Sequence, residues 1–293
     1  MYLDRFGEVN DMGSIPFYAK RFVSGSNFEE AFNIVEKLNQ KKISVTLDVL
    51  GENIKEKNQA LKFTEEYDLL LKRIAEKKLD SYVSVKLTML GLDIDHEFCF
   101  ENLCKILKTA DQFNCRVALD MEGSDYTERT LAMYERAAKD FSSPEIVLQA
   151  YLHRTENDIN RVIAANGKLR LCKGAYKEPA EKALQKMPQI VENYKKLIQK
   201  LLVDGKRVCI ASHDDEVIDF CMQFIEKNNI PKDRYEFQML YGMREKTWSR
   251  IREKGHNMTI YVPYGEDWQA YYSRRLTERK ENVFFVLKNL FKS

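Results

Sequence analysis

The strongest constraint in this sequence is a repeating pattern, in which a short apolar run rich in β-branched residues precedes a longer amphipathic run. Short runs of this kind predict buried strands, and the longer runs predict helices. Eight runs predict strands, at residues 43–50, 82–88, 116–121, 146–152, 169–174, 207–212, 235–240 and 258–263. Strands that alternate with helices form a parallel sheet, and eight such units predict an α/β fold of the (β/α)8 TIM-barrel type.

A doubly wound dinucleotide-binding sheet is the main alternative for such an alternation. That fold carries a G-x-G-x-x-G motif near its first strand, and none of the 12 glycines forms one. The barrel is therefore favoured. The chain of 293 residues is expected to form one domain, residues 1–293, with residues 1–42 as an N-terminal helical cover outside the barrel. Residues 28–38 carry the helical pattern of that cover.

The predicted helices show apolar positions on one face and glycines near their ends. Helical spacing joins Leu61, Leu69, Ile74 and Leu79 after the first strand and Val217, Phe220, Phe224 and Ile225 after the sixth. Gly167, Gly205 and Gly255 each stand just before a predicted strand, where we expect them to end helices in the left-handed conformation.

The composition excludes several classes of function. With 47 Lys and Arg against 45 Asp and Glu, the net charge of +2 gives no field that would gather nucleic acid. The 6 cysteines lie singly in apolar segments and the 4 histidines are dispersed, so neither predicts a metal site. Such cysteines indicate a reduced, cytoplasmic protein. No apolar run approaches the ~20 residues of a membrane span.

Polar residues at the C-terminal ends of the predicted strands are candidates for the active site, because a β/α barrel places its chemistry there. They are Lys86, Asp120, Glu122, Gln149, His153, Arg170, Lys173, Ser212, His213, Asp214, Tyr261 and Tyr264. A charge inside an apolar strand is costly unless it is paired, so Lys86 indicates either a site residue or a structural ion pair to a neighbouring strand. Ser212-His213-Asp214 does not predict a catalytic triad, since neighbours along a strand end point in different directions.

The predicted last helix, which begins at residue 267, carries Arg274 and Arg275 side by side, with Glu278 one turn beyond Arg274. Two adjacent guanidinium groups suit bidentate capture of a carboxylate or a phosphate. A solvated helix face with an ordinary ion pair fits the same pattern. The local sequence leaves both interpretations open.

At these positions the sequence closely resembles the proline dehydrogenase family, flavin-dependent barrel enzymes that oxidise L-proline. The matching stretches run in order along the chain and read SVKLTMLGLDID (84–95), LDMEGSDYTERTL (119–131), LQAYLHRTENDI (148–159), RLCKGAYKEP (170–179), ASHD (211–214), EFQMLYGM (236–243) and YVPYGEDWQAYYSRRLTERKEN (261–282). Colinear matches over most of the chain make the resemblance specific.

The resemblance implies a role for each matching residue. It implies that Lys86, Arg274 and Arg275 bind the proline carboxylate, that Tyr176, Leu240 and Tyr261 pack on the ring, that Asp120 supports them, and that Glu278 pairs with the cations. It implies FAD as cofactor, bound by Gln149, Arg170, Lys173, Gly174, Ala175, Ser212 and His213, with Arg170 near the flavin N5. It also implies that the last helix lies over the barrel mouth.

The implied reaction is oxidation of L-proline to Δ1-pyrroline-5-carboxylate by hydride transfer to flavin N5, the first step of proline catabolism. The expected partners are L-proline and a quinone or other electron acceptor, without nucleic acid. The form expected is the monofunctional bacterial one, cytoplasmic, with peripheral contact at the inner face of the cell membrane. The rivals are a dehydrogenase for 4-hydroxyproline or another cyclic imino acid, a flavin-free lyase or isomerase whose arginine pair holds a phosphate, and a non-catalytic barrel.

Overall fold

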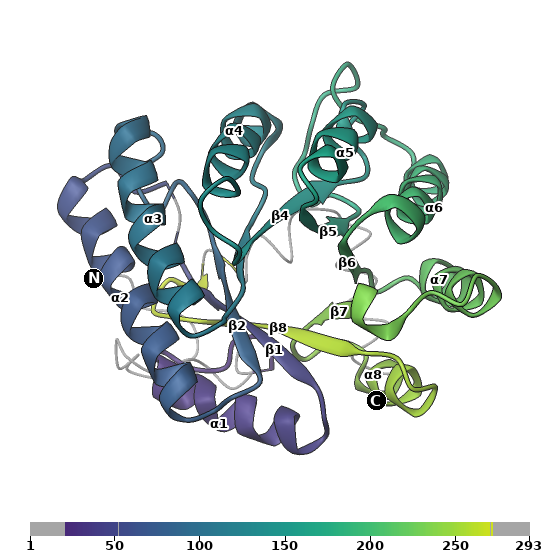
Figure 1. Cartoon of the computed structure of the whole chain (residues 1–293), viewed down its shortest axis with the longest axis horizontal. Helices are drawn as coiled ribbons and strands as arrows, with labels where there is room; N and C mark the ends of the chain where they lie inside the picture. Colours follow the sequence, from purple (N-terminus) through teal and green to yellow (C-terminus); the bar gives the residue numbers. More distant parts are fainter. Residues whose placement is uncertain (1–20, 52, 270, 272–293) are drawn as a thin grey trace, which may run out of the picture.

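The computed structural model describes residues 21–51, 53–269 and 271, and these form a closed barrel of eight parallel strands surrounded by helices (Figure 1). The order of strands follows the chain, and β1 pairs with β8 to close the sheet. The strands are β1 (Ser44–Val49), β2 (Ser81–Val85), β3 (Val117–Leu119), β4 (Pro144–Gln149), β5 (Lys168–Cys172), β6 (Arg207–Ala211), β7 (Tyr235–Leu240) and β8 (Met258–Tyr264). The predicted (β/α)8 fold is confirmed.

A helix follows each strand from β1 to β7, and one further helix precedes β1. They are α1 (Phe28–Gln40), α2 (Lys57–Glu76), α3 (His96–Gln112), α4 (Thr127–Ala137), α5 (Thr155–Ala164), α6 (Met187–Asp204), α7 (Asp215–Lys227) and α8 (Glu245–Glu253), with short 3-10 helices η1 (Ser124–Tyr126) and η2 (Lys232–Arg234). Within the ranges that the structure describes, no helix is both long enough and apolar enough to cross a membrane.

Helix α1 covers the seam where the barrel closes. The Asn27 side chain caps it by accepting from the backbone N–H of Glu30, and it buries one face that includes Phe32 and Val35. This face contacts β1 and β8, so α1 packs on the outer surface between the first and last strands (Figure 1). The predicted helix at residues 28–38 is confirmed and extends to Gln40.

Several details of the predicted elements are wrong. Strand β2 ends at Val85 rather than at residue 88, because the carbonyl of Lys86 accepts from the N–H of Met89 and begins a turn. Leu69, expected on the apolar face of α2, is 45% exposed. Strands β3, β4, β5 and β6 also end one to three residues earlier than predicted, because the chain leaves the sheet there to form the loops of the barrel mouth.

Of the three helix-ending glycines, Gly255 adopts the expected left-handed conformation, with φ of 80°. Gly205 does not, since its φ is −76°. At the third position Asn166, with φ of 51°, takes the left-handed conformation in place of Gly167. Asparagine tolerates this region better than other residues with a side chain.

The main hydrophobic core lies between the strands and the helices, whereas the interior of the barrel is polar. Along β1, Val45 and Leu47 belong to the apolar core, while the side chains of Thr46 and Asp48 form hydrogen bonds inside the barrel with Ser84 of the adjacent β2 and with Lys86 just after it. Side chains of successive strand residues point to opposite faces, so this alternation follows from the strand itself. Polar interior residues are unusual for this fold, in which bulky branched side chains usually fill the centre.

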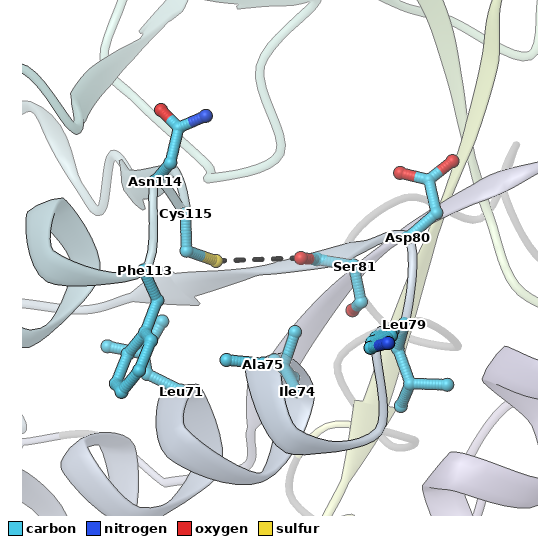
Figure 2. A pocket seen from close by; sticks show the side chains of 10 residues that line it. Leu71, Ile74, Ala75, Leu79, Asp80, Ser81, Phe113, Asn114 and Cys115 are labelled. Carbon is cyan, nitrogen blue, oxygen red and sulfur yellow. Dashed lines mark hydrogen bonds between the residues drawn. The ribbon is translucent and has the colours of Figure 1, made fainter.

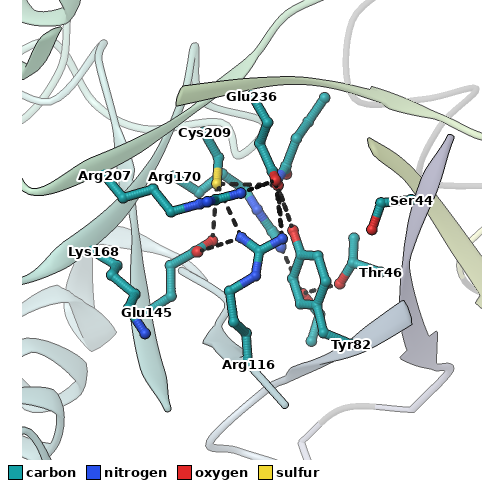
Figure 3. A network of polar contacts seen from close by, with 12 residues as sticks. Ser44, Thr46, Tyr82, Arg116, Glu145, Lys168, Arg170, Arg207, Cys209 and Glu236 are labelled. Carbon is teal, nitrogen blue, oxygen red and sulfur yellow. Dashed lines mark hydrogen bonds and ion pairs between the residues drawn. The ribbon is translucent and has the colours of Figure 1, made fainter. Parts of the chain in front are cut away.

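Near the N-terminal ends of the strands, the barrel interior holds a network of paired charges (Figure 3). The two terminal nitrogens of Arg116 lie 3.1 Å from Glu145 Oε2 and 2.9 Å from Glu236 Oε2. Arg207 reaches Glu236 Oε2 at 2.7 Å, and the Tyr82 hydroxyl donates to Glu236 Oε1 at 3.1 Å. Burial opposes ionisation of Glu236, but Arg116 and Arg207 outweigh it and hold the pKa of this carboxyl well below its ordinary value.

Removal of the Glu236 carboxylate should destabilise the fold strongly, because it leaves two arginines in the barrel without their shared anion. For Glu236→Ala we expect a loss of roughly 3–5 kcal/mol in the free energy of unfolding, measured by urea denaturation. Since folding depresses the pKa of Glu236, its contribution is present above the ordinary carboxyl pKa of about 4.5 and is lost as the pH falls. Glu135→Ala, which breaks a partly exposed pair with Arg161, is the control and should cost much less. Equal losses in the two variants would contradict this account.

Candidate active site

Six polar side chains meet above this network, toward the C-terminal ends of the strands, and we call them the mouth cluster. They are Asp48, Ser84, Lys86, Asp120, Arg170 and Tyr261. They come from β1, β2, β5 and β8 and from the first residues after β2 and β3. The closed parallel sheet brings them together, because all its strands end at the same rim.

Asp120 is the centre of the mouth cluster. Its Oδ1 accepts from Arg170 Nη1 at 2.7 Å and from Ser84 Oγ at 3.3 Å, and its Oδ2 accepts from the Tyr261 hydroxyl at 2.7 Å. Arg170 Nη2 also donates to Ser84 Oγ at 3.1 Å. One carboxylate thus fixes both a guanidinium and a phenol.

The mouth cluster keeps Arg170 charged and Tyr261 neutral. Burial opposes the charge on Arg170, but Asp120 outweighs it and raises the pKa of the guanidinium. Burial, with the nearby charges of Asp120 and Asp48, raises the pKa of Tyr261 well above its ordinary value. Tyr261 therefore stays a hydrogen-bond donor, and its ring centroid lies 5.5 Å from the Arg170 guanidinium carbon.

Lys86 follows directly after β2 and forms an ion pair with Asp48 of β1, with 2.6 Å between Nζ and Oδ1. An ion pair to a neighbouring strand is one of the two interpretations that the sequence allowed for Lys86. The Lys86 side chain is 12% exposed, so it is not completely sealed inside the barrel. Burial would lower the pKa of Lys86, but the carboxylates of Asp48 and Asp120 outweigh it and raise that pKa above its ordinary value.

The residues expected to bind FAD lie on the adjoining part of the rim, at the ends of β4, β5 and β6. Gln149 donates from Nε2 to the carbonyl of Glu122 at 3.0 Å and accepts at Oε1 from the N–H of Ala175 at 3.4 Å. Lys173 pairs with Asp214 at 2.5 Å. The predicted cofactor residues are thus neighbours in space, although four strands or loops contribute them.

The loop after β6 is held by backbone contacts. The Ser212 hydroxyl accepts from the N–H of Asp214 at 3.2 Å, and His213 Nε2 accepts from the N–H of Leu240 at 2.9 Å. Arg244 donates to the carbonyl of His213 at 2.5 Å. A ring nitrogen that accepts from a backbone N–H carries no proton, so these contacts fix the orientation and tautomer of His213.

One feature of this rim fits a bound flavin. Arg170 is 4% exposed, yet its Nε has no hydrogen-bond partner among the residues that the structure describes, and a buried donor of this kind calls for an acceptor. Gly174 has a structural reason of its own: at its φ of +117° an added Cβ would lie 2.2 Å from the Tyr151 ring, so glycine lets this ring pack directly on the loop. A polar rim with an unpartnered donor suits a polar cofactor.

The other predicted site residues divide into two groups. Tyr176 lies partly buried in the loop after β5, and Leu240 ends β7. Arg274, Arg275 and Glu278 lie outside the described residues. In the preceding segment, Trp268 and Tyr271 pack near Leu50, which follows β1, and the chain after β8 therefore starts at the barrel mouth.

The rule that polar residues at the C-terminal ends of strands form the site, here called the strand-end rule, missed Asp48. It also left out the loop contacts that support the mouth cluster. Asp48 lies inside an apolar run, so the argument that singled out Lys86 applies to it equally. Thr88 donates from its hydroxyl to Glu122 at 2.7 Å and accepts from the N–H of Asn53 at 3.2 Å, which ties together the loops after β1, β2 and β3. These contacts join residues far apart in the chain, so no local pattern reveals them.

A metal site or a separate cavity could also serve a function. The structure has no group of three His, Cys, Asp or Glu side chains that could hold a metal ion within its described ranges. An open cavity of about 370 Å³ lies between the C-terminal part of α2 and the residues just after α3, and is lined by residues that include Leu71, Phe113 and Cys115 (Figure 2). It borders the start of β2, at the end of the barrel opposite Lys86, and is separate from the mouth cluster.

Comparisons with known proteins point to one family. A family model described as proline dehydrogenase matches residues 31–288. Proline dehydrogenase 2 of Bacillus subtilis (strain 168) is 41% identical, covering 100% of this chain and 97% of that protein. Proline dehydrogenase of Deinococcus radiodurans is 32% identical, covering 94% and 90%. A solved structure of proline utilization A from Bdellovibrio bacteriovorus, inactivated by N-propargylglycine, superposes with a TM-score of 0.82 at 28% identity, covering 88% of this chain and 32% of that one.

The backbone at Gly174 should be sensitive to a single added carbon. Gly174→Ala places a side chain at φ of +117° against the Tyr151 ring, and we expect it to cost about 1–3 kcal/mol in the free energy of unfolding. Gly123→Ala, at a glycine where the nearest atom would be 3.6 Å away, should stay within about 0.5 kcal/mol of the unsubstituted protein. A Gly174→Ala protein as stable as Gly123→Ala would contradict the geometry of this loop.

Proposed function

The chain belongs to the proline dehydrogenase family and is an oxidoreductase that acts on proline, and from that premise we propose that it oxidises L-proline to Δ1-pyrroline-5-carboxylate with FAD as the electron acceptor. Proline oxidation is the first step of proline catabolism. The observation that carries the proposal is the mouth cluster, which holds a lysine and an arginine, each on its own carboxylate, at the catalytic rim of the barrel. Such a site presents fixed cations to a small anionic substrate.

The substrate carboxylate would bind Lys86, together with Arg274 and Arg275 from the C-terminal segment. Lys86 is suited to this because two of its three N–H donors remain after the bond to Asp48. Binding through several cations fixes both the position and the rotation of a small ring. Such orientation contributes much of the rate when two bound molecules react with each other. Glu278 would pair with the arginines and help close the site.

The substrate ring would pack against Tyr261, Tyr176 and Leu240. Tyr261 is held in place because its hydroxyl donates to Asp120 at 2.7 Å. A fixed aromatic wall crowds a substituent on the ring, which favours proline over 4-hydroxyproline. Asp120 therefore acts as a positioning residue for the wall and for Arg170 at once.

FAD would be held by Gln149, Arg170, Lys173, Gly174, Ala175, Ser212 and His213. When bound, FAD supplies a flat acceptor whose N5 takes the hydride that leaves the ring carbon next to nitrogen. The unpartnered Nε of buried Arg170 supports its place beside the flavin. We propose a quinone or another oxidant as the final electron acceptor, and a cytoplasmic protein with peripheral contact at the inner face of the cell membrane.

The carboxylate assignment is tested by Lys86→Met, which keeps the length of the side chain and removes its charge. We expect proline turnover with an artificial electron acceptor to fall on the order of tenfold or more in kcat/KM, because a charge-assisted hydrogen bond is lost. Lys196→Met, which removes an exposed lysine paired with Glu156, should leave turnover unchanged. Normal turnover by Lys86→Met would refute the assigned role of Lys86. Absence of proline turnover in the unsubstituted protein would refute the function.

A further inference from the structure

Asp48 is a buried carboxylate of the mouth cluster to which neither the sequence nor the family resemblance gave a role. Its side chain is 1% exposed, and its Oδ1 accepts from Lys86 Nζ at 2.6 Å. Its Oδ2 has no hydrogen-bond partner in the described part of the chain. The Tyr261 hydroxyl lies nearby but donates its single proton to Asp120. Within the described ranges, Lys86 is thus the direct donor to Asp48, while the Tyr261 hydroxyl lies near both Asp48 and Asp120.

The register of β1 and β2 sets the direction of this pair. Asp48 aligns with Ser84, so it lies two residues deeper in the barrel than Lys86. The carboxylate is accordingly on the inner side of the pair, and the more exposed lysine is on the side of the mouth. An ammonium held from behind keeps its remaining donors for a ligand that enters from the front.

A buried lysine needs an anion to stay charged. Desolvation lowers the pKa of Lys86, and the largest opposing contribution comes from Asp48. Burial also raises the pKa of Asp48 itself, against the effect of Lys86. The titratable and charged groups that surround this pair from the neighbouring elements are Tyr67 on α2, Asp120 and Glu122 after β3, Arg170 on β5, and Tyr261 and Tyr264 on β8.

We propose that Asp48 is a positioning residue for substrate binding, which keeps the Lys86 ammonium charged and aimed at the mouth so that Lys86 can bind the substrate carboxylate. The inference rests on the proposed function, because it takes Lys86 as a carboxylate ligand. Asp48 does not touch the substrate in this account. Its effect passes entirely through Lys86, and this makes the inference testable by a double-mutant cycle.

The probe is cyclopentanecarboxylate, which has the ring and carboxylate of proline but no amine to oxidise. Its dissociation constant is measured by calorimetry on the full-length, FAD-loaded protein. For Asp48→Asn we expect the constant to rise about tenfold or more, and to rise further between about pH 7 and pH 9 as the unpaired lysine loses its proton. In the unsubstituted protein it should stay level over that range, because the folded-state pKa of Lys86 is raised.

The control is Glu145→Gln, a swap of carboxylate for amide at an equally buried site in the deeper network, bonded to Arg116. It should leave the dissociation constant of cyclopentanecarboxylate unchanged at every pH. It measures any effect that comes merely from removing a buried charge inside the barrel.

The decisive comparison is between Lys86→Met and the double variant Asp48→Asn with Lys86→Met, which does not require the single Asp48 variant to fold. If Asp48 acts through Lys86, the two proteins bind cyclopentanecarboxylate equally, within about twofold. Weaker binding by the double variant, or unchanged binding by Asp48→Asn at all pH values, would overturn the role of Asp48. An unsubstituted protein that leaves proline unoxidised would instead overturn the proposed function, and this assignment with it.

Discussion

The structure depends on one constraint, that each charge placed inside the barrel needs a partner inside the barrel. Burying an unpaired ion costs several kcal/mol, so a polar interior is stable when its charges are matched. The deeper network meets this requirement because Arg116 pairs with Glu145 and shares Glu236 with Arg207, although the Nε of Arg207 has no partner among the described residues. The mouth cluster meets it with hydrogen-bonding capacity left over, at Lys86 and at the Nε of Arg170.

The position of each cluster along the barrel axis relates the fold to the chemistry. The same closed sheet carries both, one above the other, and the strand register decides which charges lie deep and which lie near the rim. Deep charges support the barrel. Charges near the rim keep donors for a ligand, and Asp120 fixes the donors of Arg170 and Tyr261 in place before any ligand arrives. Preorganised groups of this kind need little rearrangement when charge shifts during a reaction.

Sequence patterns predicted the barrel because strand alternation is local and repeats eight times, which averages out errors at single boundaries. They predicted strand ends and helix ends less well. Lys86 was placed inside β2 although the chain already turns there, and Gly205 was expected to take a left-handed conformation that it lacks. Turn geometry and capping depend on contacts beyond the local window, which the spacing of apolar residues does not encode.

The site residues also divide into those that the sequence indicated and those that it missed. The strand-end rule and the family resemblance together indicated Lys86, Asp120, Arg170 and Tyr261, and the structure brings these four into one cluster. Asp48 escaped because its partner Lys86 lies 38 residues away, so no local pattern links the two charges. Glu145 and Glu236 escaped for a different reason: they stand near the starts of β4 and β7, whereas the active-site candidates were taken from the opposite ends of the strands.

The central claim is that the mouth cluster orients proline beside a flavin, and the visible absorption spectrum during anaerobic addition of L-proline tests it most directly. The account predicts a purified protein with a flavin band that bleaches as proline is added. A flavin band that proline leaves unchanged would contradict the substrate assignment. A colourless protein that FAD cannot reconstitute would contradict the cofactor assignment as well.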